Sequence, residues 1–171
     1  IEEYKNERVS DEKTAQLLET ELQQLNEALG KTNITGEGIV IQIVDKQGES
    51  IGENAYVAPI IAEDLLIIVN DLFGAGAEAI SINEQRIVTT SAIECDGNVI
   101  KINGVKIGAP FEIKAIGFPE TLINIDRFGG YTQILRETRK LKVSVEKSDK
   151  EKITIPKYTG VMKFEYAQSQ Y

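Results

Sequence analysis

Residues 70–87, NDLFGAGAEAISINEQRI, decide the fold, because an apolar helix stops within them at a glycine and a strand begins directly afterwards. Gly74-Ala75-Gly76 looks like part of a nucleotide-binding fingerprint. However, phosphate-binding glycines follow a strand and open a helix, where free amides face the phosphate. Here the glycines close a helix, and its exposed carbonyl groups repel phosphate. We therefore interpret Gly76 as a left-handed helix cap.

Strands and helices alternate on both sides of this junction. The β-branched run Ile39–Asp45 predicts a buried strand, and the broad apolar face of residues 62–75 predicts a helix. Further strands are expected at Glu78–Asn83, Ser91–Asp96, Val99–Asn103, Phe111–Ile116, Val143–Glu146 and Ile153–Ile155, and residues 158–167 form either an edge strand or a tail. A second helical region runs from Pro119 to about Leu141, with a break at Gly129-Gly130.

This order places two strand-helix-strand units around a hairpin. The turns at Gly97-Asn98 and Asn103-Gly104 predict that this hairpin forms an elongated arm beyond the sheet. It predicts an α+β domain of the ferredoxin-like, split β-α-β type over residues 36–167. Such a domain has one mainly antiparallel sheet with helices on one face.

Residues 1–30 are different in kind, because they contain no proline, no glycine before Gly30 and many good helix formers. Their apolar positions are spaced alternately by three and four residues, as in the seam of a coiled coil: Ala15, Leu18, Leu22, Leu25 and Leu29. Further back the seam is interrupted by Arg8 and Asp11. We expect a long helical stalk that either pairs with a partner helix or a second copy, or packs as a single amphipathic helix on its own domain.

The composition excludes several classes of function. With 27 acidic against 19 basic residues the net charge is -8, and no strongly basic patch compensates for it, so we expect no binding to nucleic acid. The chain has no histidine, which removes histidine-assisted nucleophiles, histidine-ligated zinc and imidazole acid-base catalysis. The single cysteine, Cys95, is expected to be a small buried hydrophobe. We predict a protein that is not an enzyme and binds no cofactor.

Paired carboxylates offer one route to metal chemistry. Asp45, at the end of the first predicted strand, could share a divalent ion with Asp71 or Asp96, as in the cyclases that place two aspartates on a related sheet. A turn at Asp45-Lys46-Gln47-Gly48 explains the same residues, so no metal site is predicted.

Asn83, Gln85 and Arg86 form the candidate ligand or partner site. The guanidinium of Arg86 is a planar fork suited to a carboxylate or phosphate, and the two amides can add directed hydrogen bonds. The more ordinary interpretation is that Arg86 pairs with an acidic residue of its own domain while the amides satisfy loop backbone.

Several separated blocks resemble one bacterial family. NDLFGAGAEAISINEQRI, TSAIECDGNVIKING, FEIKAIGFPETL, and VSVEKSDKEKITIP followed by YTG, are similar to the YlxW/YlxX-like family, domain-of-unknown-function family 881, over roughly residues 36–167. Glu84 stands where the family commonly has glycine, which leaves the turn type at Asn83-Glu84 open. Phe118 stands where a polar residue is frequent.

The resemblance implies a protein of Gram-positive bacteria with a transmembrane anchor, a coiled-coil stretch and a globular domain outside the cytoplasm, encoded near genes for cell division and wall synthesis. No enzymatic activity is established for the family. Because the chain begins at Ile1 rather than methionine, we expect the anchor to lie in a segment missing from this sequence. The expected function is that of a membrane-tethered interaction domain with protein partners, including itself through residues 1–30. The alternative is a sensor of a small anion or carbohydrate.

Overall fold

The structure is a computed structural model that describes residues 2–44, 59–127, 129–148, 152–163, 165–168 and 170, with the side chains of the first helix described from Glu12 onward. Asp45 lies outside the described residues. The helices are α1 (Glu2–Ala28), α2 (Ala62–Gly74), α3 (Pro119–Leu122), α4 (Asn124–Arg127) and α5 (Tyr131–Glu137). The strands are β1 (Ile34–Gly36), β2 (Gly38–Val44), β3 (Ala79–Ile82), β4 (Gln85–Ile87), β5 (Ile93–Asp96), β6 (Val99–Ile102), β7 (Val105–Ile107), β8 (Phe111–Ile116), β9 (Lys142–Lys147) and β10 (Ile153–Ile155).

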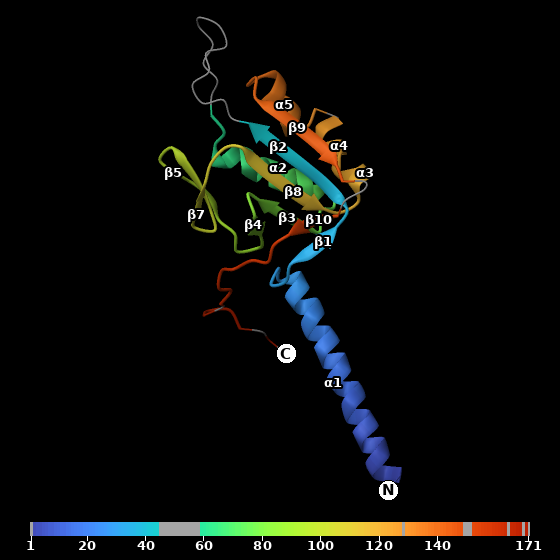
Figure 1. Cartoon of the computed structure of the whole chain (residues 1–171). Helices are drawn as coiled ribbons and strands as arrows, with labels where there is room; N and C mark the ends of the chain where they lie inside the picture. The colour runs from blue at the N-terminus through green and yellow to red at the C-terminus, as the bar shows by residue number, and fades with distance from the viewer. Residues whose placement is uncertain are drawn as a thin grey trace, which may run out of the picture.

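A five-stranded antiparallel sheet in the order β4-β3-β8-β2-β9 forms the centre of the domain (Figure 1). In the middle of it Ile41 of β2 lies opposite Ile113 of β8 and Val145 of β9. The chain is thus of the α+β class with antiparallel sheets and a helix at its beginning, as the sequence predicts.

The two faces of the sheet differ because side chains alternate along each strand. On one face Ile39, Ile41 and Ile43 are fully buried, whereas Gln42 between them is exposed on the other. The core on the first face also contains Leu65, Ile68 and Leu72 of α2, Leu122 of α3 and Leu135 of α5. The opposite face is partly covered by the antiparallel pair β1-β10, whose Ile153 and Ile155 pack against Ala79 and Ile116.

The junction after α2 has the predicted cap. Gly76 adopts a φ of +92°, and its amide donates to the carbonyl of Phe73 while the amide of Ala77 donates to that of Leu72. This pair of bonds is the Schellman motif, which satisfies the last carbonyls of a helix. The chain then turns directly into β3.

Several elements differ from the sequence predictions. The second helical region is three short helices, α3, α4 and α5, and the predicted hairpin arm is a three-stranded sheet, β5-β6-β7. In the described part of residues 158–167 there is no strand. Cys95 is exposed rather than buried, because β5 leaves one side open to solvent.

Helix α1 projects away from the sheet, on the side where the C-terminal segment also runs (Figure 1). It ends in a second Schellman motif, in which Gly30 has a φ of +69° and Lys31 donates its amide to the carbonyl of Asn26. Among the helices that the structure describes, none is both long and apolar enough to cross a bilayer.

Candidate functional site

The β3-β4 turn positions two of the predicted site residues. Asn83 and Glu84 both have positive φ, 44° and 63°, as in the type I′ turn that suits a two-residue hairpin. The Asn83 side chain donates to the carbonyls of Gly108 and Pro110, at 3.1 and 3.2 Å, and accepts the amide of Glu112 at 2.8 Å. Its hydrogen bonds therefore hold the hairpin against β8.

Gln85 and Arg86 lie on opposite faces of β4. Gln85 is opposite Ile82, which belongs to the helix-covered core, whereas Arg86 is opposite Ser81 on the other face. The structure therefore does not bring the three predicted residues together around one ligand. Of the three, Arg86 alone borders the pocket described below.

Arg86 is buried, with 5% of its surface exposed. Its backbone carbonyl accepts hydrogen bonds from Ser91 Oγ and Asn103 Nδ2, at 3.3 and 2.9 Å. Its guanidinium Nε and Nη1 are buried without a hydrogen-bond partner, and no acidic residue in the described part of the chain pairs with it. Burial lowers the pKa of Arg86 from its ordinary value. The interpretation that Arg86 pairs with an acidic residue of its own domain is thus wrong for the residues described.

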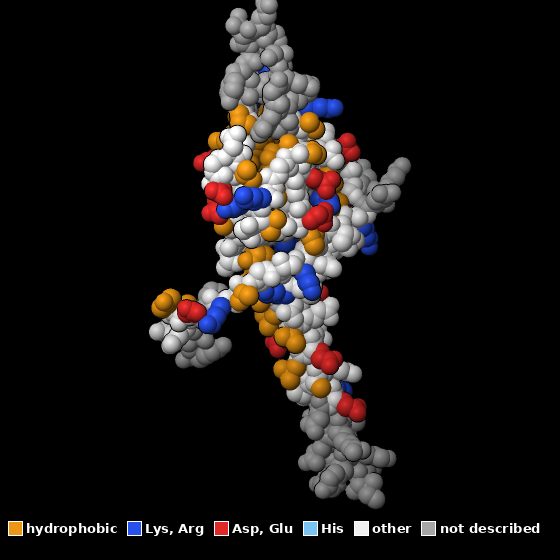
Figure 2. All heavy atoms as spheres, turned by 60° about the vertical axis from the view of Figure 1, so that its left-hand side comes forward, with side chains coloured by type: hydrophobic (Ala, Val, Ile, Leu, Met, Phe, Trp, Pro, Cys, Tyr) orange, Lys and Arg blue, Asp and Glu red, His pale blue; other side chains and the backbone are white. Residues whose placement is uncertain are grey.

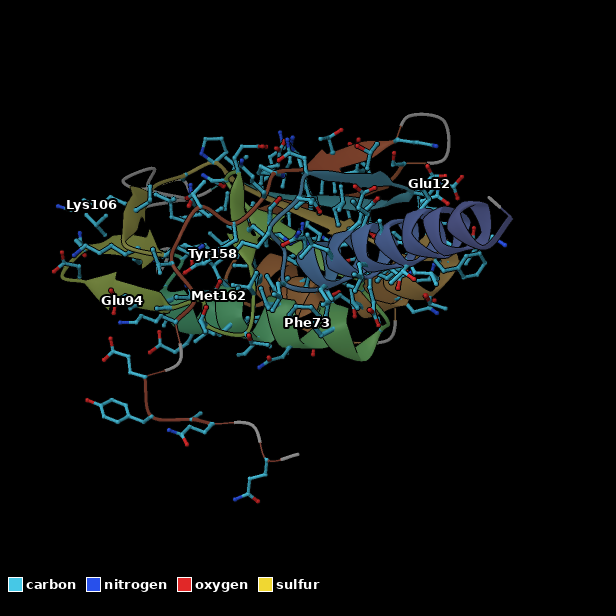
Figure 3. The ribbon with its side chains drawn as sticks, turned by 90° about the horizontal axis from the view of Figure 1, so that it is seen from below. Glu12, Phe73, Glu94, Lys106, Tyr158 and Met162 are labelled. Carbon is cyan, nitrogen blue, oxygen red and sulfur yellow. The ribbon has the colours of Figure 1, made fainter. Side chains whose placement is uncertain are left out.

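A pocket of about 260 Å³ lies against Arg86 at the base of α1. We call it the stalk-base pocket, and define it by residues 28–30, Phe73, Glu78, residues 86–89 and Met162. Most of these side chains are apolar. Figure 3 views the domain from below, with Phe73 of α2 and Met162 of the C-terminal segment on this underside. Four separate parts of the chain thus meet around one guanidinium.

The end of α1 is fixed to the pocket by close contacts. A Cβ atom on Gly30 would lie 2.8 Å from Val88 Cγ1 and 3.5 Å from Arg86 Nε, so only glycine fits here without displacement. The Gly30 carbonyl accepts the amide of Tyr158 at 2.7 Å, and Lys31 Nζ donates to the carbonyl of Gly160 at 2.8 Å. Lys31 Nζ also lies 5.4 Å from the centre of the Tyr158 ring, within range of a cation-π contact. These contacts hold the C-terminal segment beside the stalk.

Glu78 is the carboxylate of the pocket lining. It is exposed and forms no ion pair with Arg86 within 4.0 Å. The pocket therefore combines one buried cation, one solvated anion at its border and apolar walls. The guanidinium of Arg86 offers several donors in a planar fork to an acceptor of matching shape.

Sequence reasoning found Arg86 but missed the other walls of the pocket. Phe73 and Met162 carry no local pattern that distinguishes them from ordinary apolar residues. Gly30 gave a usable signal, since a glycine that ends a long helix requires a positive φ and permits close approach of another segment.

A second polar cluster lies between α2 and α5. Asp64, 1% exposed, accepts two 2.6 Å hydrogen bonds from Arg139 Nη1 and one, also 2.6 Å, from the Tyr131 hydroxyl. Asp64 Oδ2 accepts the amide of Ile61 as well, at 2.8 Å, and Arg139 Nη2 donates to the carbonyl of Pro59. Burial and the hydrogen bond to Asp64 raise the pKa of Tyr131. Because the carboxylate is fully bonded within the protein, this cluster joins two helices and offers no open ligand position.

The carboxylates considered for a metal do not form a site in the described residues. Asp96 forms an ion pair with Lys101 at 2.6 Å, and Asp71 is half-buried on α2. The described residues include no group of three or more cysteine or acidic side chains placed to hold a metal ion.

The family model described as "Bacterial protein of unknown function (DUF881)" matches residues 21–168. The chain belongs to this family. UPF0749 protein YlxW of Bacillus subtilis is 32% identical over 120 residues, which cover 70% of this chain and 52% of that protein. UPF0749 protein YlxX of the same organism is 33% identical over 144 residues, which cover 82% and 60%. The resemblance to YlxW and YlxX is thereby confirmed.

These DUF881 relatives extend beyond the matched region, since the chain spans about half to three-fifths of the length of the curated relatives from Bacillus. A solved structure has the same fold. It is the crystal structure of an uncharacterised conserved protein from Mycobacterium tuberculosis, with a TM-score of 0.68 and 22% identity, covering 88% of this chain and 99% of that one. The comparisons establish the family and the fold.

Proposed function

We propose that this chain is the extracytoplasmic part of a membrane-tethered, non-enzymatic interaction protein, which pairs through α1 and acts in cell division or envelope assembly. The observation that carries the proposal is the apolar stripe on α1. Leu18, Leu22, Leu25 and Leu29 are 60%, 60%, 57% and 45% exposed. Figure 2 shows hydrophobic side chains following the projecting helix. An exposed stripe of this spacing is the surface that a second helix covers in a coiled coil.

The residues beside the apolar stripe define which side chains would face each other in a parallel pair of two copies. With Leu22 and Leu29 at a positions and Leu18 and Leu25 at d, Glu21 and Ala28 take g positions and Glu19 and Asn26 take e positions. In a parallel dimer the residue at g faces the e position five residues later in the partner. Glu21 then faces Asn26 and Thr14 faces Glu19, whereas Glu7 faces Glu12 in the same register, so one pair of carboxylates opposes the pairing near the beginning of the helix. The net negative charge of residues 1–30 also weakens the pairing, so we expect it to strengthen with salt.

The order of the central strands supports a ferredoxin-like assignment within this proposal. Sheet order β9-β2-β8-β3 corresponds to the fourth, first, third and second strands of two successive strand-helix-strand units, all antiparallel to their neighbours. The added edge strand β4 carries Arg86. Domains of this plan serve many functions, so the plan by itself does not identify a partner.

Analytical ultracentrifugation of residues 1–171 over a concentration series tests self-pairing. Leu22→Asp places a charge in the seam and should give a monomer. Leu17→Asp is the matched control, because Leu17 is 70% exposed on the same helix but lies outside the seam. We expect a concentration-dependent dimer for the wild type and the control. A wild-type monomer at every concentration, or equal loss of dimer in both variants, contradicts the proposal. Crosslinking of the full-length protein in its native membrane tests the tether and its partners.

A further inference from the structure

We propose that the stalk-base pocket binds a small monocarboxylate with an apolar body, whose carboxylate lies on the Arg86 guanidinium. This proposal is independent of pairing through α1. The pocket would make the domain a sensor of that metabolite class, with the ligand held between the end of α1, α2, β4 and the C-terminal segment.

No acidic residue in the described part of the chain neutralises the Arg86 guanidinium. Buried charges in folded proteins are paired or hydrogen-bonded, because removing an ion from water costs several kcal/mol when nothing replaces the lost solvation. Arg86 is buried, and two of its guanidinium nitrogens have no partner among the residues that the structure describes. Arg86 lines the stalk-base pocket, and because Nε and Nη1 are themselves closed to solvent, a carboxylate in the pocket reaches them when the guanidinium or its neighbours shift. A carboxylate matches the planar fork of arginine and can accept two parallel hydrogen bonds from it.

The charge around the pocket favours a single carboxylate over phosphate. Arg86 is the cation of the pocket lining, and Glu78 stands at the same pocket with a negative charge. Arg86 would balance only one of the two negative charges of a dianionic phosphate, and Glu78 would repel the phosphate. The net charge of -8 of the chain adds to this repulsion. A monoanion is balanced by Arg86 alone.

The walls and the volume define the rest of the ligand. Ala28, Leu29, Phe73, Val88 and Met162 present apolar surface. Binding sites for drug-sized ligands typically measure about 300–1,000 Å³, so about 260 Å³ suits a body of only a few carbons. A short aliphatic acid fulfils both requirements.

Met162 gives a direct readout, because it is the one methionine of the chain and lines the pocket. We would label its methyl group with carbon-13 and titrate residues 1–171 with sodium hexanoate, with hexanamide as the uncharged analogue and with inorganic phosphate. We expect a saturable shift of the methyl resonance with hexanoate, at least about tenfold weaker binding of hexanamide, and no saturable shift with phosphate. The side-chain Nε resonance of Arg86 should move with the same dissociation constant.

Three variants locate the binding. Arg86→Met removes the charge and keeps much of the volume, and should weaken hexanoate binding about tenfold or more. Phe73→Ser changes a wall at a residue that is already 45% exposed, so it tests the pocket even if the Arg86 variant fails to fold. Arg127→Met is the matched control, an exposed arginine outside the pocket lining.

No saturable shift with hexanoate overturns the proposal, as does equal binding of hexanoate and hexanamide. Tighter binding of phosphate than of hexanoate also overturns it, because it would assign the guanidinium to a different anion. Loss of binding in Phe73→Ser but not in Arg127→Met supports it.

Discussion

Two arginines of this domain, Arg86, which is buried, and Arg139, which is half-buried, have different surroundings. Arg139 lies between α2 and α5, where Asp64 accepts both of its short hydrogen bonds and the Pro59 carbonyl accepts another. Arg86 lies on β4 at the foot of α1, more deeply buried, and within the described part of the chain its Nε and Nη1 have no acceptor. The same side chain is therefore neutralised inside the protein in one region and left open to a pocket in the other.

The difference separates a structural role from a binding role. The Asp64–Arg139 pair fixes α5 against the beginning of α2, and the hydrogen bonds that Asp64 accepts from Arg139, Tyr131 and the Ile61 amide offset the burial of its carboxylate. Arg86 contributes no such bond, and its burial opposes folding. A side chain that opposes folding is explained more readily by an external partner than by stability.

The largest effect on stability is expected when the ion pair between Asp64 and Arg139 is broken. Asp64→Ala leaves the Arg139 guanidinium without its carboxylate, and should reduce the free energy of unfolding by about 3–5 kcal/mol. Urea unfolding followed by circular dichroism measures the loss. Asp71→Ala, a half-buried aspartate on the same helix, is the control and should change stability by about 0.5 kcal/mol or less. A loss below about 1 kcal/mol in Asp64→Ala would show that the pair is not a structural element.

The second largest effect tests whether Arg86 binds a carboxylate ligand. A ligand that binds only the folded state at 100 times its dissociation constant stabilises a protein by about 2.7 kcal/mol. Sodium hexanoate at that excess should therefore raise the melting temperature of the wild type, and should raise that of Arg86→Met by about half as much or less, because binding about tenfold weaker still stabilises the variant. Differential scanning calorimetry at constant ionic strength, adjusted with sodium chloride, makes the comparison. Equal increases in both proteins would mean that hexanoate acts elsewhere.

A smaller effect on stability, opposite in sign to that of Asp64→Ala, is expected when Arg86 is replaced in the absence of ligand. Arg86→Met removes an unpaired buried charge, so the free energy of unfolding should stay constant or rise by about 1 kcal/mol. The same urea experiment measures it. A loss of more than about 2 kcal/mol would mean that the guanidinium already has a stabilising partner within the protein. The contrast between the two arginines would then disappear.

The sequence predicted best the elements whose pattern is local and long enough to recognise. Phe111–Ile116 and Ile153–Ile155 are the predicted strands at their predicted bounds, and Gly76 caps α2 as expected. The three-residue strands β1, β4 and β7 were missed although β10, of the same length, was predicted, because a three-residue pattern is too short to identify a strand consistently. The helical region predicted after Pro119 has its predicted break at Gly129-Gly130, between α4 and α5, and a further break that was not predicted divides its first part into α3 and α4.

Of the residues that line the stalk-base pocket, only Arg86 was predicted from the sequence as a site residue. The fork of Arg86 was recognisable from sequence, but whether a buried arginine finds a carboxylate depends on side chains far away in the chain. Asp64 and Arg139 are 75 residues apart, and no local pattern joins them. Met162 and the end of α1 likewise reach the pocket only through the tertiary fold.

The smallest effect concerns the proton of Tyr131, which donates to Asp64 in the closed cluster. Burial and this hydrogen bond raise the pKa of Tyr131 above its unfolded value of about 10. Above pH 10 the unfolded state therefore loses this proton more readily than the folded state, so the stability that Tyr131 contributes is present below pH 10 and declines as the pH rises. Tyr131→Phe should weaken the decline between pH 9 and 11, measured as the difference in melting temperature between the two proteins. Groups common to both, including Lys101 and Lys114, cancel in that difference. An identical pH dependence would mean that the Tyr131 hydroxyl does not contribute to holding Asp64, so that the contrast with Arg86 would depend on the Arg139 ion pair and the Ile61 amide.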